Sequence, residues 1–519
     1  MLTFTRRAVA LWAVITLQSF VATAQPIKPP KPLVSAVQLA RTCQSLASIS
    51  IPNTTIDLAA EEPAKSGTNL PYCRVVATVT HPPAGDRIKV FLALPITGWN
   101  GRFVGIGGGG FVGGTEESLR APVALGYAAG STDTGHQGGG GDFALDANGR
   151  LNWTLIRDNA HAGIHEMTVL GKALTEAFYN TAPRRSYFAG CSSGGRQGLS
   201  EAQRYPADYD GIIAGAPAVS WTKLHVSQMW GQVLMLEANH FIPQCKFEAA
   251  VKAAVEACDA LDGVKDGVIT DPRICKYDPQ DLIGKPASGC EPINQTDADI
   301  IRKIWEGPRR QDGSVLWYGL TRGASFSGLY NTGDPRTGKP FPITLAWFRY
   351  FLTQNPNWDW TTITRGAYEQ FWTQSTEQFG EVFATGNPDL TAFRDHGGKA
   401  ILWHGWNDQL IYPQGTIDYF DRVQQKMGQK TTEFIRLFMA PGANHCASGA
   451  GPVPSVGELY DSILAWVEDG KAPSTLTVMR MDGNNAVKSS RPLCVHPLVA
   501  RYKGSGSIDD KANFVCAAR

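Results

Sequence analysis

Short apolar runs that predict β-strands occur in the first 220 residues of the chain and again near its end. Two of them alternate apolar and polar positions like the strands of a hairpin, at 74–80 and 87–94. The remaining runs are 126–133, 186–189, 209–217, 399–404 and 435–440. Helical periodicity lies between them, at 158–179 and 195–204. Strands that alternate with helices are typical of a parallel sheet covered by helices, so we expect an α/β fold.

The alternation of strands and helices stops between about residue 220 and residue 395. This stretch is rich in Trp, Gly, Pro and Asn and contains four of the ten cysteines. We therefore expect 221–395 to form an inserted lid domain, while 25–220 and 396–519 form one catalytic domain. Within the lid, the run Trp347–Trp360 offers aromatic surfaces for stacking, and Arg349 and Arg365 are candidate carboxylate clamps. Most of these tryptophans are expected in the lid core.

One stretch has the residues of a nucleophile elbow. Gly190–Gly194 reads Gly-Cys-Ser-Ser-Gly, which matches Gly-x-Ser-x-Gly between a predicted strand and a predicted helix. Glycines on both sides relieve the strain of such a turn, and the following helix N-terminus presents N–H groups to an oxyanion. Ser192 is therefore the candidate nucleophile, and Cys191 is a rival that does not occupy the apex. An ordinary Gly/Ser-rich turn would explain the same residues, because five-residue matches often arise by chance.

Two later loops offer an acid and a base in the chain order of α/β hydrolases. Asp408 follows the strand at 399–404, and His445 follows the strand at 435–440. The order Ser, Asp, His differs from that of the chymotrypsin and subtilisin classes. His404 is an alternative base, but it ends the strand before the acid, so we interpret it as a structural histidine or an aid to the acid loop. The alternative for His445 is an ordinary surface histidine.

Two cysteines adjoin the candidate nucleophile and the candidate base. Cys191 precedes Ser192, and Cys446 follows His445. If Ser192 and His445 form a hydrogen bond, their neighbours are close enough for a disulfide. That bond would join the elbow to the histidine loop.

A glycine run precedes the elbow. Gly107–Gly110 follows a predicted strand, where α/β hydrolases place the loop that donates the second oxyanion N–H. Glycine there lets the backbone approach the substrate closely. We expect Gly110 to be the donor, with Gly109 or Gly108 next, and a flexible linker is the alternative.

The lid carries an aspartate-rich loop between Cys258 and Cys275. Its carboxylates and two backbone carbonyls could surround one cation, and these ligands are Asp259, Asp262, Val264, Asp266 and Val268. Oxygen-only ligation favours Ca²⁺, and neither histidine nor thiolate is placed for zinc. A solvated acidic loop is the alternative. Because the loop belongs to the lid, we expect the calcium to be structural.

Residues 1–24 have the pattern of a signal peptide, with Arg6 and Arg7 before an apolar stretch and an Ala-Thr-Ala site at its end. A membrane anchor is the alternative, but the apolar stretch is short and a Pro-rich segment follows. We expect a secreted or periplasmic protein whose ten cysteines form disulfides. The 48 basic and 47 acidic residues nearly cancel, which argues against nucleic acid as a partner, and no later segment is apolar enough to predict a membrane span.

With these motifs in place, the chain resembles the tannase/feruloyl esterase family of α/β hydrolases along nearly all of its mature length. The resemblance rests on the segments 190–195, 209–217, 258–275, 403–408, 441–446 and 491–506. It implies an α/β-hydrolase fold with a large inserted lid and a secreted serine carboxylesterase acting on hydroxycinnamic or hydroxybenzoic esters. The implied triad is Ser192, Asp408 and His445, the implied oxyanion donors are the N–H groups of Gly110 and Ser193, and the implied lid calcium has the ligands named above.

The resemblance also implies disulfides in addition to Cys191–Cys446. These are Cys258–Cys275 and Cys494–Cys516, with the remaining cysteines paired as Cys43–Cys73 and Cys245–Cys290. The same family contains a hydrolase of mono(2-hydroxyethyl) terephthalate, but that enzyme has Glu at the position of Ser193 and Ser at the position of Gly109. An aromatic-ester substrate of the broader family is therefore favoured. The sequence also leaves open an inactive secreted protein that binds polyphenols or carbohydrates, and a peptidase.

Overall fold

The computed structural model describes residues 28–518 except 36–37, 65–69, 334–336 and 483–485. The predicted signal peptide, 1–24, lies outside the described residues. Within the described part of the chain, no helix is both long enough and apolar enough to cross a bilayer.

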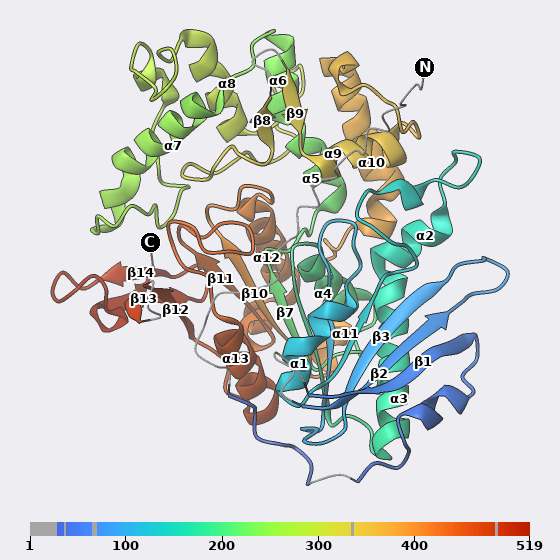
Figure 1. The fold of residues 1–519 in the computed structure, drawn as a ribbon. Helices are drawn as coiled ribbons and strands as arrows, with labels where there is room; N and C mark the ends of the chain where they lie inside the picture. Colours follow the sequence, from blue (N-terminus) through green and yellow to red (C-terminus); the bar gives the residue numbers. More distant parts are fainter. Residues whose placement is uncertain (1–27, 36–37, 65–69, 334–336, 483–485, 519) are drawn as a thin grey trace, which may run out of the picture.

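A nine-stranded sheet lies at the centre of the molecule (Figure 1), in the order β1-β2-β3-β5-β4-β6-β7-β10-β11. Its strands are β1 Thr54–Glu62, β2 Tyr72–Val79, β3 Ile88–Pro95, β4 Arg102–Ile106, β5 Ala128–Thr132, β6 Arg185–Cys191, β7 Gly211–Gly215, β10 Lys399–Gly405 and β11 Ile435–Ala440. Every neighbouring pair from β5 to β11 is parallel, as the alternation of strands and helices predicts. The expected hairpin is confirmed as β2 and β3, which pair antiparallel.

The apolar pattern of the chain does not predict the first strand of this sheet. β1 is an edge strand that pairs with β2 and contains two glutamates and an aspartate. Most of its residues are only half-buried, so it lacks the apolar run of a strand with neighbours on both sides. Charged residues on an edge strand are expected, because they oppose pairing with other chains.

Helices cover both faces of the sheet. One face packs against α3 Gly163–Tyr179, α4 Ser193–Arg204 and α12 Pro413–Met427, and the other against α1 Arg120–Ala124 and α13 Val456–Asp469. The remaining helices outside the lid are α2 Trp153–Arg157 and α11 Thr391–Asp395. The result is a three-layer α/β arrangement in which the carboxyl ends of the parallel strands carry the loops predicted to hold the site.

Between β7 and β10, the described residues contain α11, which packs against α4, and six further helices with one short hairpin. These six helices and the hairpin lie beyond one end of the sheet (Figure 1). These are α5 Trp221–Gln228, α6 Trp230–Glu237, α7 Gln244–Cys258, α8 Gln295–Glu306, α9 Pro342–Ala346 and α10 Arg365–Phe383, with β8 Tyr330–Thr332 and β9 Gly338–Pro340. They enclose an aromatic core of their own, in which Trp347, Phe351 and Phe379 are fully buried. The tryptophan at 347 is therefore lid core.

A capping box explains how the lid helix α8 begins. Asn294 caps α8 by accepting a hydrogen bond from the N–H of Asp297, and the Asp297 carboxylate accepts one from the N–H of Asn294. The same buried carboxylate contacts Lys246 Nζ at 2.6 Å and His240 Nε2 at 2.7 Å. This network joins the start of α8 to α7 and to the loop before it.

The chain ends in two small hairpins beside the sheet. They are β12 Thr475–Met481 with β13 Val487–Cys494, and β14 Val499–Tyr502 with β15 Phe514–Ala517. All ten cysteines pair in the expected way, as Cys43–Cys73, Cys191–Cys446, Cys245–Cys290, Cys258–Cys275 and Cys494–Cys516.

An ion pair joins the central strands to α13. The guanidinium of Arg102 in β4, whose side chain is 2% exposed, donates to Glu468 Oε1 at 2.7 Å and to Oε2 at 2.6 Å. Tyr187 in β6 donates to the same carboxylate at 2.6 Å. Removal of one partner from a buried pair leaves a charge without compensation, which is far more costly than the loss of an exposed pair.

We predict that Arg102→Met lowers the free energy of unfolding by about 3–5 kcal/mol, measured by guanidinium denaturation with disulfides intact. Arg74→Met is the matched control, because the Arg74–Glu116 pair is 33% and 35% exposed. That control is expected to cost about 0–1 kcal/mol. Equal losses in the two variants would contradict the structural importance of the buried pair.

Candidate active site

The nucleophile elbow has the predicted strand–turn–helix form. β6 ends at Cys191, α4 begins at Ser193, and Ser192 lies between them with φ +64° and ψ −124°. This backbone region is unfavourable for a residue with a Cβ. The turn leaves no room for side chains at its glycines: a Cβ on Gly190 would lie 2.5 Å from backbone of Gly194, and one on Gly194 would lie 2.9 Å from Gly108 O. Ser192 itself is 9% exposed.

The glycine run packs against the N-terminus of α4. The N–H of Gly194 donates to Gly108 O at 2.9 Å, and the Ser193 hydroxyl donates to Gly110 O at 2.6 Å. The N–H of Gly108 is occupied by Gln197 Oε1 at 3.0 Å, which removes Gly108 from the candidate oxyanion donors. Among the described residues, no hydrogen-bond acceptor faces the N–H of Gly110 or that of Ser193.

Gly110 also lies close to the lid. Its φ is +58°, and a Cβ there would lie 2.7 Å from Cδ1 of Ile343, in α9. The next residue, Phe111, stacks on Phe351 of the lid core with ring centroids 5.4 Å apart. The loop that carries the candidate oxyanion donor is therefore held between α4 and the lid.

Asp408 and His445 form a direct pair. Asp408 Oδ2 lies 2.7 Å from His445 Nδ1, and Asp408 Oδ1 accepts hydrogen bonds of 2.8 Å from the N–H groups of Leu410 and Ile411. The Asp408 side chain is fully buried, and that of His445 is 7% exposed. Burial raises the pKa of Asp408, but His445 and His404 outweigh it and hold the pKa well below its ordinary value. Asp408 is therefore a carboxylate at neutral pH.

His404 faces this acid as well. Its Nε2 lies 3.0 Å from Asp408 Oδ2 and 3.2 Å from Ile411 O, and its Nδ1 lies 2.8 Å from Thr416 Oγ1. Both ring nitrogens are thus occupied by neighbours other than Ser192. This geometry favours the interpretation of His404 as an aid to the acid loop over that of a base.

A disulfide holds the serine loop beside the histidine loop. Cys191 and Cys446 are bonded with their Cα atoms 6.1 Å apart. Within the described part of the chain no hydrogen bond joins Ser192 Oγ to His445, whose backbone N–H donates to Gln409 Oε1 at 3.1 Å. Such hydrogen bonds are often long in ligand-free structures and tighten when substrate binds.

The aspartate loop of the lid makes its own internal contacts. Asp259 Oδ1 accepts from the N–H groups of Asp266 at 3.1 Å and Val268 at 3.2 Å, and Asp262 Oδ1 accepts from that of Val264 at 2.9 Å. Asp266 Oδ2 lies 3.1 Å from a guanidinium nitrogen of Arg491 in the C-terminal tail, a partner that the sequence pattern does not indicate. Burial raises the pKa of Asp266; Arg491 opposes this and the two other aspartates add to it.

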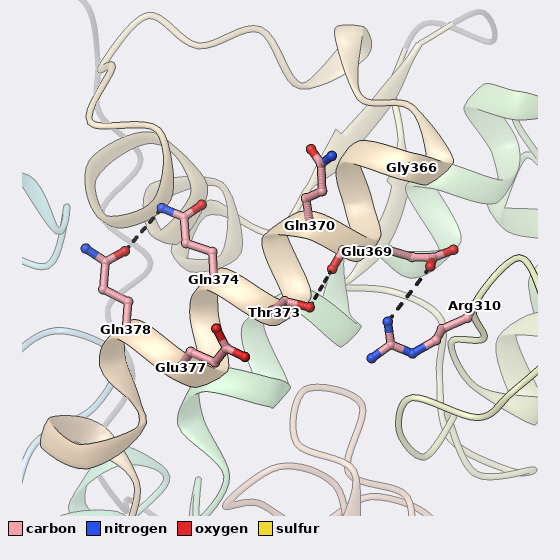
Figure 2. A pocket seen from close by; sticks show the side chains of 8 residues that line it. All are labelled: Arg310, Gly366, Glu369, Gln370, Thr373, Gln374, Glu377 and Gln378. Atoms are coloured by element: carbon pink, nitrogen blue, oxygen red, sulfur yellow. Dashed lines mark hydrogen bonds and ion pairs between the residues drawn. The ribbon is translucent and has the colours of Figure 1, made fainter.

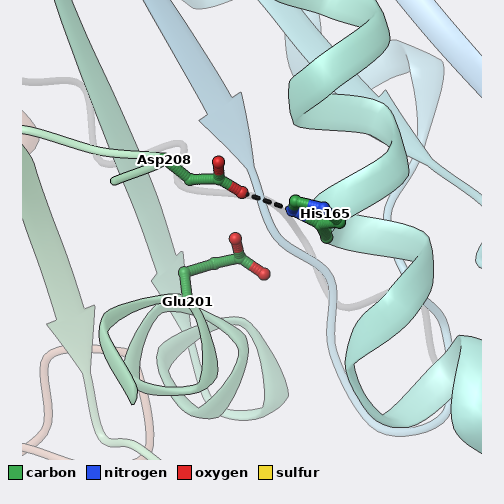
Figure 3. Close-up of side chains that lie close together, drawn as sticks. All are labelled: His165, Glu201 and Asp208. Carbon is green, nitrogen blue, oxygen red and sulfur yellow. Dashed lines mark hydrogen bonds and ion pairs between the residues drawn. The ribbon is translucent and has the colours of Figure 1, made fainter. Parts of the chain in front are cut away.

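Three residues elsewhere bring their ligand atoms closer together than the lid aspartates do. Among the described residues, a His/Asp/Glu group whose ligand atoms all lie within 4.8 Å of one another is formed by His165, Glu201 and Asp208 (Figure 3). His165 Nδ1 lies 2.7 Å from Asp208 Oδ2. Burial raises the pKa of Glu201 well above its ordinary value, and the neighbouring Asp208 adds to the effect. Both carboxylate oxygens of Glu201 are buried and have no hydrogen-bond partner among the described residues.

Neither of two further features involves the predicted catalytic residues. Figure 2 shows a surface hollow along α10, lined by Arg310, Gly366, Glu369, Gln370, Thr373, Gln374, Glu377 and Gln378, none of them a predicted site residue. The two expected carboxylate clamps are engaged within the lid. Arg365 pairs with Glu237 at 2.6 Å, and Arg349 Nε donates to Trp358 O at 3.1 Å.

We predict that Cys191→Ala with Cys446→Ala slows the labelling of Ser192 by a fluorophosphonate by about a hundredfold, because the serine and histidine loops are then free to separate by about 1 Å. The matched control is Cys494→Ala with Cys516→Ala, which removes a disulfide between β13 and β15 in the tail. Near-UV circular dichroism verifies that both variants remain folded. Equal labelling rates in the two folded variants would contradict a role of the first disulfide in the site.

Known proteins are similar to this chain in sequence and in fold. Residues 73–517 match the family described as "Tannase and feruloyl esterase". The chain is 40% identical over 470 residues to a probable feruloyl esterase of Arthroderma benhamiae, covering 88% of this chain and 87% of that one. It is 30% identical over 511 residues to the mono(2-hydroxyethyl) terephthalate hydrolase of Piscinibacter sakaiensis, covering 83% and 81%.

The fold is similar to that of a solved member. The crystal structure of feruloyl esterase B from Aspergillus oryzae superimposes with a TM-score of 0.82 at 26% identity, over 92% of this chain and all of that chain. The three-layer arrangement is accordingly the expected α/β-hydrolase fold. Because the family match spans most of the chain and a relative is 40% identical over 88% of it, the protein belongs to the tannase and feruloyl esterase family of carboxylic ester hydrolases.

Proposed function

We propose that the protein is a secreted serine carboxylesterase that hydrolyses esters of hydroxycinnamic or hydroxybenzoic acids through Ser192, His445 and Asp408. The observation that carries this proposal is the 2.7 Å contact between Asp408 Oδ2 and His445 Nδ1. The loop that carries His445 is joined by a disulfide to the strained turn at Ser192. A binding protein without catalytic activity would need neither feature.

We infer one role for each nitrogen of His445. Nδ1 donates to the Asp408 carboxylate, so its hydrogen is fixed there and Nε2 remains as the basic nitrogen. Nε2 would take the proton of the Ser192 hydroxyl while Oγ attacks the ester carbonyl carbon. Asp408 would hold this tautomer and stabilise the imidazolium that forms.

The backbone N–H groups of Gly110 and Ser193 would stabilise the tetrahedral oxyanion. When the intermediate collapses, the ester C–O bond breaks and the alcohol leaves with the proton from His445. The acyl group then remains on Ser192. A water molecule, deprotonated by His445, attacks this acyl-enzyme, and Ser192 regains its proton as the acid is released.

The names of the relatives support an aromatic acyl group. Those named above are a probable feruloyl esterase and a mono(2-hydroxyethyl) terephthalate hydrolase. The terephthalate half-ester is the second candidate substrate, favoured by 30% identity to that hydrolase. We give it second place because the terephthalate hydrolase has Glu at the position of Ser193. In this chain the Ser193 hydroxyl donates a hydrogen bond to Gly110 O beside the proposed oxyanion hole, and this contact requires Ser193.

We also propose that the aspartate loop of the lid binds a structural Ca²⁺. Three carboxylates lie in one short loop closed by Cys258–Cys275, and burial together with mutual repulsion raises the pKa of Asp266. Asp259, Asp262 and Asp266, with the carbonyls of Val264 and Val268, would supply hard oxygen ligands, and the cation would offset the repulsion. No step of the ester hydrolysis passes through this site.

We also propose that the protein is exported from the cytosol. The segment 1–24 has the pattern of a signal peptide, and five disulfides are typical of proteins that fold outside the cytosol.

Removal of the proposed nucleophile should abolish hydrolysis. The wild type should hydrolyse at least one of methyl ferulate, methyl gallate and the terephthalate half-ester, and Ser192→Ala should lower kcat by at least about 10⁴-fold. The matched control is Ser200→Ala in α4, the helix that follows Ser192. It removes a buried hydroxyl that has no hydrogen-bond partner among the described residues. Full activity in Ser192→Ala would refute the assigned nucleophile, and the ranking of the three esters identifies the substrate class.

Removal of the proposed lid calcium should destabilise the protein. Excess EGTA should lower the thermal midpoint of the wild type, because a cation at about 100 times its Kd stabilises the folded state by about 2.7 kcal/mol. Asp262→Asn should show a lower midpoint that EGTA no longer changes, whereas Asp281→Asn, in a neighbouring exposed turn, should behave like the wild type. A wild-type midpoint that does not respond to EGTA or added Ca²⁺ rules out the calcium site.

A further inference from the structure

The acid of the proposed triad contacts two imidazoles rather than one. Asp408 Oδ2 lies 2.7 Å from His445 Nδ1 and 3.0 Å from His404 Nε2. His404 is at the end of β10, four residues before Asp408, and its side chain is fully buried. The two histidines therefore share one carboxylate oxygen.

The neighbours of His404 determine where its hydrogen lies. Nε2 faces two acceptors, Asp408 Oδ2 and Ile411 O, so Nε2 must carry a hydrogen and donate it. Nδ1 faces the hydroxyl of Thr416, which has no other hydrogen-bond partner among the described residues. The Thr416 hydroxyl can donate to Nδ1, so both ring nitrogens have partners when Nε2 carries the hydrogen. Thr416, on α12, thus supports the form in which His404 donates to the acid.

The remaining contacts of Asp408 show what this donor does. Its Oδ1 accepts two backbone N–H groups at 2.8 Å, from Leu410 and Ile411. With His404 present, each carboxylate oxygen accepts two hydrogen bonds, so the four acceptor sites of the carboxylate are filled. The carboxylate cannot rotate without breaking one of these bonds, and one lone pair of Oδ2 stays directed at His445.

We propose that His404 is a positioning residue that orients Asp408 toward His445, and that Thr416 supports His404 through Nδ1. This role rests on the hydrolysis proposed above. His404 touches neither substrate nor the reacting serine. Its contribution is made through the geometry of the acid and through its charge distribution. A donor on Oδ2 draws negative charge away from the Asp408–His445 contact, so its removal should strengthen the attraction of Asp408 for the imidazolium form of His445.

The test compares three variants. His404→Leu removes the donor, His404→Gln keeps an N–H near the position of Nε2, and Thr416→Val removes the hydroxyl with little change of shape. His240→Gln is the matched control, because His240 likewise contacts a buried carboxylate, that of Asp297 in the lid, at 2.7 Å. Each variant is assayed with methyl ferulate across pH and by its rate of inactivation by diisopropyl fluorophosphate, which needs no ester substrate.

We expect His404→Leu to lower kcat by about ten- to a hundredfold, the value of one hydrogen bond to a charged group, with little change in KM. The acid limb of kcat/KM should move to higher pH, because the imidazolium of His445 is then harder to deprotonate. His404→Gln should recover most of the loss. Thr416→Val should lie between them, and it provides the test if His404→Leu does not fold. His240→Gln should match the wild type.

Two results would overturn the proposal while the proposed function stands. In the first, the wild type is inactivated at Ser192, but His404→Leu or Thr416→Val leaves kcat, the inactivation rate and the pH profile unchanged. The second is equal loss in His404→Leu and His404→Gln with an unchanged pH profile, which would indicate packing alone. A wild type that neither hydrolyses the ester nor reacts with the fluorophosphate would overturn the proposed function and the role of His404 with it.

Discussion

The disulfide between Cys191 and Cys446 is the constraint on which the site depends. It joins two loops that are 255 residues apart in the chain, one carrying Ser192 and the other His445. Each loop is also fixed from its own side: the serine turn by β6 and α4, and His445 by the buried carboxylate of Asp408. A covalent link between two fixed supports limits the relative motion of the two groups that are proposed to exchange a proton.

The lid is part of this construction rather than a separate cover. Phe111, next to the candidate oxyanion donor Gly110, packs in the aromatic core of the lid, and Ile343 of α9 lies against Gly110 itself. Ser193 reaches the same glycine from the side of the nucleophile helix. The lid and α4 thus determine together where the Gly110 backbone lies, which connects the lid to the proposed oxyanion hole.

Much of this can be predicted from the sequence where the chemistry is local. The elbow requires glycines beside Ser192 in a short strand–turn–helix segment, and the acid and base follow single strands, so chain order alone indicates Asp408 and His445. Features that depend on tertiary contacts cannot be predicted in this way. The role of Thr416 requires the packing of α12 on β10, and Arg491 approaches Asp266 from a tail hairpin whose strands have no clear apolar alternation. The edge strand β1 could not be predicted from the apolar pattern, because most of its residues are only half-buried and its charged residues interrupt that pattern.

The central claim is that Ser192 forms a covalent acyl intermediate, and trapping that intermediate tests it most directly. The wild-type protein would be mixed with the p-nitrophenyl ester of ferulic acid, quenched in acid during the first turnover, digested and examined by mass spectrometry. We expect a burst of p-nitrophenol of about one equivalent and a feruloyl group on the peptide that contains Ser192. Turnover without a burst, or a feruloyl group on another residue, would contradict the assignment of Ser192 as the nucleophile.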